Sequence, residues 1–145
     1  MEDIIVRMVG RISVPFIQVY GFYVILHGHL TPGGSFSGGA ILGSSMILFA
    51  LAFNLERGHK KLTHEASTLL ECGGASWFAI LGLVGVYAGV NFLANQAAGF
   101  YMGIPNTLVS AGAIPLITLG LGLKVASTVV TLFYSLAEVE GDSHD

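Results

Sequence analysis

Two histidines and a dense run of glycines mark the stretch HGHLTPGGSFSGG, residues 27–39, which lies between two long apolar segments. His27 and His29 could bind a metal ion, but two imidazoles are too few ligands, and positions i and i+2 of a helix face apart. A phosphate-binding loop would need a preceding strand and a Gly-Lys-Ser/Thr ending, and this stretch has neither. The sequence therefore predicts histidines that form hydrogen bonds, and no metal or nucleotide site.

The same stretch carries the signals for a tight turn followed by closely packed helix. Pro32 presets the backbone for the second position of a type II turn, and Gly33 suits the positive φ of the third. Proline also disfavours helix at the residue before it, Thr31. The predicted turn and helix-packing motif comprises Pro32, Gly33, Gly34, Phe36, Gly38 and Gly39.

The elements that must position these residues are membrane-spanning helices. Apolar residues make up 53% of the chain and charged residues 10%, and the mean hydropathy is +0.74, outside the range of ordinary soluble domains. No charged residue occurs between Arg11 and Glu56 or between Glu71 and Lys124, and each stretch has room for two crossings of about 20 residues. Because the alternating polarity of a β-barrel is missing, we predict an all-α integral membrane protein with a single four-helix domain over residues 1–145. The predicted spans are residues 12–30, 36–55, 72–92 and 110–136.

The basic residues predict the orientation of these spans. All of them except Lys124 fall before the first span or between the second and third: Arg7, Arg11, Arg57, Lys60 and Lys61. The other two connections contain no lysine or arginine. By the positive-inside rule both termini are cytoplasmic, the protein lies in the cytoplasmic membrane as a multi-pass chain, and His27 and His29 lie at the outer interface.

Two segments outside the spans have their own patterns. Residues 56–71 are polar, yet Leu62, Ala66, Leu69 and Leu70 recur at i, i+4, i+7 and i+8, which predicts a short amphipathic helix along the cytoplasmic membrane surface. The acidic tail, residues 138–145, lacks the apolar residues to fold alone, so disorder and docking on a partner are both open.

Glycine accounts for 20 residues, most of them within the predicted spans. Gly39 and Gly43 in the second span, and Gly82, Gly85 and Gly89 in the third, remove side chains from one helix face so that another helix can approach. Packing within the bundle and packing on other subunits explain this pattern equally well.

Lys124 is the sharpest functional signal. It lies roughly 21 Å from Glu138 along a helix, too far to reach the cytoplasmic edge, and a lysine near the membrane centre costs about 2.5–3.5 kcal/mol on insertion scales. We expect Glu71 at the mouth of the third span and every other acid outside the membrane. Lys124 then needs an acid on another subunit or a hydrated path, where it either forms an ion pair or exchanges a proton. A purely structural lysine that ties two subunits together is the alternative, and Glu71 is a second candidate for proton entry.

The motif GHLTPGGSFSGG resembles the signature of the MnhB family, one of the subunit families of the multisubunit Na⁺/H⁺ antiporters, in which a Gly-His pair is followed by Pro-Gly-Gly-Gly-Phe-x-Gly-Gly. The matching residues are Gly28, His29, Pro32, Gly33, Gly34, Phe36, Gly38 and Gly39, while Ser35 stands where a third glycine is usual. Related subunits occur in archaeal membrane-bound hydrogenases and sulfur-reducing complexes, and the stretch AGAIPLITLGLGLKVAS is more similar to that branch. The resemblance implies a subunit without a cofactor, in a complex whose redox centres belong to other chains.

The expected function is that of a noncatalytic membrane subunit of a cation (Na⁺)/proton antiporter module within a hydrogenase-like respiratory complex. Lys124, Glu71, His27 and His29 are the candidates for an ion path or coupling interface. The alternative is an assembly subunit with no part in ion movement. The expected partners are other membrane subunits, the lipid bilayer, Na⁺ and H⁺. Nucleic acid is not expected, because the net charge is −3, and no catalytic or metal-binding constellation points to an enzyme.

Overall fold

The protein is all-helical in the computed structural model, which describes residues 2–30, 32–53, 64–105, 107 and 110–142. The long helices are α1 (Glu2–Leu26), α2 (Gly34–Phe53), α4 (His64–Tyr87) and α5 (Ile114–Asp142), and a short 3₁₀ helix, η1, covers Gln96–Ala98. Within these described ranges, 4 helices are long and apolar enough to cross a membrane. The prediction of an all-α protein with four such helices is therefore confirmed.

The helices extend beyond the uncharged segments from which the spans were predicted. α1 begins at Glu2 and includes Arg7 and Arg11, because a charged residue ends a membrane span without ending a helix. α4 begins at His64, so residues 64–71 form its first turns instead of a separate surface helix. Residues 54–63 lie outside the described ranges. α5 continues through the first acidic residues of the predicted tail to Asp142, and residues 143–145 are not described.

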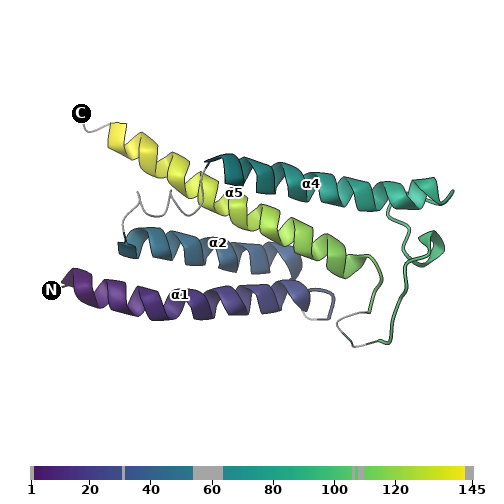
Figure 1. The fold of residues 1–145 in the computed structure, drawn as a ribbon, viewed down its shortest axis with the longest axis horizontal. Coiled ribbons are helices and arrows are strands. Elements are labelled where there is room, and N and C mark those ends of the chain that lie inside the picture. The colour runs from purple at the N-terminus through teal and green to yellow at the C-terminus, as the bar shows by residue number, and fades with distance from the viewer. Residues whose placement is uncertain (1, 31, 54–63, 106, 108–109, 143–145) are drawn as a thin grey trace.

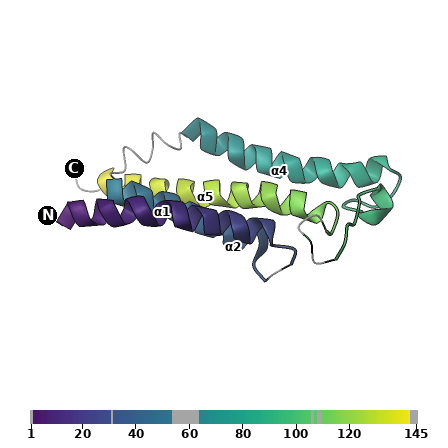
Figure 2. The ribbon, with the colours of Figure 1, turned by 60° about the horizontal axis from the view of Figure 1, so that its bottom comes forward.

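The helices are arranged around α5. α2 packs against both α1 and α5 along much of its length, α4 packs against α5, and α1 touches α5 only slightly. Figure 1 shows α5 crossing between α2 on one side and α4 on the other, with α1 beyond α2. In Figures 1 and 2 the start of α1 and the end of α5 lie at the same end of the bundle.

Three of the long helices pack closely where α1, α2 and α5 meet. Ile25 of α1 is only 1% exposed and fills the space that Gly38 of α2 and Gly122 of α5 leave open. A Cβ atom built on Gly39 would lie 2.5 Å from the carbonyl oxygen of Gly122 and 2.8 Å from Cβ of Val125. These glycines let the helix backbones approach closely, as small residues do in membrane bundles.

The glycines of α4 have a different neighbour. A Cβ on Gly85 would lie 2.5 Å from the carbonyl oxygen of Asn91, and Gly82 faces the ring of Phe92, so both accommodate the chain that folds back after Tyr87. Gly89 follows the helix with φ of +77°, which favours glycine. Within the described ranges, the glycines of α2 and α4 that the sequence singled out therefore pack inside this chain or form its turns.

Candidate functional site

The predicted turn lies between α1 and α2. Gly33 and Gly34 have φ of +152° and +83°, and α2 begins at Gly34; Thr31 lies outside the described residues. Gly28 packs against Gly34, since a Cβ on Gly28 would lie 2.6 Å from Cα of Gly34. Pro32 and Phe36 are exposed, so the motif packs through its glycines and leaves these two side chains outward.

The two histidines form hydrogen bonds to backbone carbonyls. Nδ1 of His27 donates to the carbonyl oxygen of Tyr23 at 3.1 Å, and the two rings lie 4.0 Å apart between centroids. Nε2 of His29 donates to the carbonyl oxygen of Thr107 at 3.2 Å, which ties the α1–α2 connection to the α4–α5 connection. Within the described ranges no group of three or more His, Cys, Asp or Glu side chains is placed to hold a metal ion.

Lys124 is half-buried on the side of α5 that faces α4. Its Cβ would lie 2.7 Å from a Cβ built on Gly74, so the two helices are in close contact there. Its backbone carbonyl accepts a hydrogen bond from Oγ1 of Thr128 at 3.0 Å. Among the side chains that the structure describes, no carboxylate forms an ion pair with the Lys124 ammonium.

Glu71 faces α5 from the first part of α4. Because α4 begins at His64, Glu71 lies two turns from the start of the helix. It is half-buried, and its Oε1 accepts a hydrogen bond of 3.2 Å from Oγ1 of Thr131 on α5. Gly74, one turn further along α4, is the residue that contacts Lys124. Glu71 and Lys124 therefore share the α4–α5 interface, although no ion pair joins them.

Three hydroxyl side chains that sequence reasoning missed complete this interface; we call Ser67, Ser127 and Thr131 the hydroxyl cluster. Oγ of Ser67 lies 2.6 Å from Oγ of Ser127 and 2.5 Å from Oγ1 of Thr131. On α4, Ser67 and Glu71 lie at i and i+4, and on α5, Ser127 and Thr131 have the same spacing. Side chains at this spacing share a helix face. That spacing was the available signal, but the register between the helices decides whether the pairs meet.

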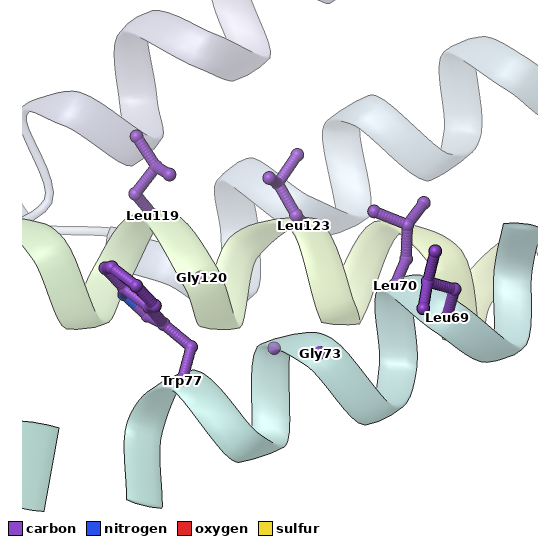
Figure 3. Close-up of a pocket in the computed structure, with 8 residues that line it drawn as sticks. Leu69, Leu70, Gly73, Trp77, Leu119, Gly120 and Leu123 are labelled. Atoms are coloured by element: carbon purple, nitrogen blue, oxygen red, sulfur yellow. The ribbon is translucent and has the colours of Figure 1, made fainter. Parts of the chain in front are cut away.

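Two apolar cavities flank the interface. One, of about 340 Å³, lies between α4 and α5 beside Gly73 and Gly74, and Figure 3 shows Trp77 of α4 and Leu119 of α5 at one end of it. Nε1 of Trp77 donates to the carbonyl oxygen of Leu116 at 3.0 Å, which anchors this end of α4 to α5. The other cavity, of about 250 Å³, lies among the four long helices, and Ser127 is part of its wall.

Comparison with known proteins gives concordant matches. Residues 5–131 match a family model described as a domain related to the MnhB subunit of Na⁺/H⁺ antiporter. An antiporter subunit, mnhB2, from Staphylococcus aureus is 32% identical over 136 residues, which cover 94% of this chain and 95% of that protein. An uncharacterized protein from Methanocaldococcus jannaschii is 33% identical over 120 residues, which cover 81% of this chain and 45% of that protein.

A solved structure is also similar in fold and sequence. A chain in the membrane-bound sulfane sulfur reductase, an archaeal respiratory membrane complex, superposes with a TM-score of 0.73 at 32% identity, over 87% of this chain and 54% of that chain. This chain thus spans about half the length of the reductase chain and of the M. jannaschii protein, and nearly all of the S. aureus protein.

Proposed function

Because this chain belongs to the MnhB family of Na⁺/H⁺ antiporter subunits, we propose that it is a noncatalytic membrane subunit of a multisubunit cation/proton antiporter module. Family membership together with four apolar helices makes it a multi-pass membrane protein, and we assign it to the cytoplasmic membrane. The likeness to a chain of an archaeal respiratory complex supports a place in a respiratory assembly whose redox chemistry is on other chains.

The observation that carries a role in ion movement is the shared position of Lys124 and Glu71. Ionisable side chains inside membrane helices are costly and mark ion or proton pathways. Here two of opposite charge lie in one helix interface without pairing with each other. We therefore assign part of the ion path or the coupling interface to this chain, with Na⁺ and H⁺ as the transported ions. His27 and His29 are assigned a supporting role, since both are engaged with backbone carbonyls.

A purely structural assembly role is the second candidate. Exposed aromatic and aliphatic side chains on α1, such as Phe16 and Val19, favour contact with lipid or with neighbouring membrane subunits. The two roles differ in what a transport measurement reports, because an assembly subunit alters ion movement only through the amount of intact complex.

Co-purification tests the membership of a complex. The tagged chain, extracted in a mild detergent and identified with its partners by mass spectrometry, should bring down larger antiporter-type membrane subunits. For a respiratory assembly, chains that carry redox centres should follow in constant ratio. Recovery of the chain alone, under conditions that keep other membrane complexes intact, would contradict the proposal.

Thiol labelling tests the proposed orientation, in which both termini and the start of α4 face the cytoplasm. In a Cys72→Ala background, which removes the exposed native thiol, Gln96→Cys should react with a membrane-impermeant maleimide in intact cells. Glu65→Cys should react only after the membrane is permeabilised. The reverse pattern would invert the topology.

A further inference from the structure

We propose that Glu71 and the hydroxyl cluster form a Na⁺ site between α4 and α5, in which Na⁺ and a proton compete for the Glu71 carboxylate. The site rests on the proposed function, because it gives the ion path a defined binding position. It also assigns a ligand role to Ser67, Ser127 and Thr131.

The atoms that surround the proposed site are all oxygen atoms. Beside the Glu71 carboxylate, three hydroxyl oxygens lie together, and two backbone carbonyl oxygens complete the group: that of Ser67 accepts from Ser127 at 3.0 Å, and that of Ser127 accepts from Thr131 at 3.0 Å. Carboxylate, hydroxyl and carbonyl oxygens are hard ligands, suited to cations such as Na⁺. No nitrogen or sulfur atom takes part in these hydrogen bonds.

The hydroxyl cluster has few protons to donate. Each hydroxyl has one proton to donate and two lone pairs. When Ser127 and Thr131 donate to the backbone carbonyls of Ser67 and Ser127, their lone pairs face Oγ of Ser67 and the Glu71 carboxylate. Ser67 then donates its own proton to one of these two hydroxyls, and a lone pair of the other hydroxyl and the Glu71 carboxylate remain available to a cation. When the cation leaves, the hydroxyls rotate and Thr131 donates to Glu71 instead.

The charge of the Glu71 carboxylate also favours a bound cation. Ser67 is 5% exposed and Ser127 2%, whereas Glu71 and Thr131 are half-buried at the edge of these serines. An ionised carboxylate in a membrane helix is stabilised by a positive partner. Among the described residues Glu71 has a neutral donor, Thr131, and no ion pair with Lys124. A bound Na⁺ or a proton on the carboxyl supplies a positive partner there.

A cavity adjoins the hydroxyl cluster. Ser127 lies in the wall of the cavity of about 250 Å³ that reaches α1 and α2, where Gln18 adds a polar side chain. The Gln18 amide donates a hydrogen bond of 3.5 Å to Sδ of Met46, which holds it beside the cavity. Leu70 of α4 also lines this mostly apolar cavity, so the open space reaches the interface that holds the hydroxyl cluster.

Carbodiimide labelling of the full chain in nanodiscs tests the site. Dicyclohexylcarbodiimide reacts with a protonated carboxyl in an apolar setting, and rearrangement leaves a stable N-acylurea that intact mass reports. Because Na⁺ competes with the proton, Na⁺ should slow labelling by the factor 1 + [Na⁺]/Kd, about tenfold when Na⁺ is at ten times Kd. Choline and K⁺ at equal ionic strength should not. Glu71→Gln should remove the label, whereas Glu65→Gln, on the exposed first turn of the same helix, should keep it.

Hydroxyl variants separate the proposed ligands from the carboxylate. Ser127→Ala and Thr131→Val should still be labelled but should lose the slowing by Na⁺, and Thr131→Ser should retain it because the oxygen remains. Slowing of equal size by K⁺, no slowing in the unaltered chain, or full slowing in Ser127→Ala would overturn the site. Such a result, obtained while the chain still co-purifies with antiporter-type subunits, would leave the proposed function standing.

Discussion

Lys124→Ala should leave the complex assembled and reduce cation-dependent proton flux on the order of a hundredfold, the lower end of what a positioned proton-transfer group contributes. The side chain is half-buried where α4 meets α5, and Gly74 is in close contact with its Cβ, so truncation to alanine keeps the atom on which the helix contact depends. Lys124→Arg should restore little, because arginine does not release its proton. The purified variants are reconstituted in sealed vesicles, and sodium-dependent proton flux is compared with subunit content.

A structural lysine would give the opposite pattern. Alanine would then lower the yield of complex by leaving an acid on a neighbouring subunit without its partner, and arginine would preserve both assembly and flux. The ratio of flux to assembled complex therefore separates the two roles. A fully assembled alanine variant with unchanged flux would contradict both.

Gly39→Ala should destabilise the chain by about 1–3 kcal/mol, the usual cost of an overpacked core. The added Cβ would lie 2.5 Å from the Gly122 carbonyl oxygen and 2.8 Å from Cβ of Val125, and the first of these is backbone that cannot rotate away. α2 and α5 must separate to admit the methyl group. The midpoint of thermal unfolding in detergent, followed by circular dichroism, should fall.

The matched control is Gly73→Ala on α4. A Cβ built there meets nothing within 4 Å, so the same substitution adds only helix propensity and should leave the midpoint unchanged or raise it. Equal losses in the two variants would show that the α2–α5 contact is not the tight one. An unchanged midpoint in Gly39→Ala would show that the helices accommodate the methyl group.

The sequence predicts the helices well because the membrane imposes a length and an absence of charge. It predicts helix ends poorly, because charged residues mark the edge of the apolar span and a helix can continue past that edge. Arg7 and Arg11 mark such an edge, yet α1 includes both and begins at Glu2. The glycine positions illustrate a further limit. Gly39 and Gly85 have the same sequence signal, but one faces a neighbouring helix and the other faces the returning chain at Asn91.

Only part of the candidate site can be predicted from the sequence. Lys124 is conspicuous in sequence because a charge in an apolar span is rare, and the structure places it half-buried at a helix interface. Serine and threonine carry no such signal, because their hydroxyls can bond to their own helix backbone. The contact between Ser67 and Ser127 depends on the register of α4 against α5. Trp77 packs on Gly120 further along the interface and fixes that register, which the sequence does not reveal.

α4 joins the rest of the bundle chiefly along α5 (Figure 1). The side-chain oxygen atoms of Glu71 and Ser67 belong to the α4 side of this interface, and those of Ser127 and Thr131 belong to the α5 side. A cation bound across this interface would link α4 to α5, and its binding free energy would oppose any tilt of α4. By thermodynamic reciprocity, a neighbouring subunit that moves α4 away from α5 would weaken cation binding by as much free energy as the cation adds to the cost of that movement. Because α4 contacts mainly α5, movement of α4 away from α5 would be coupled directly to release of the bound ion.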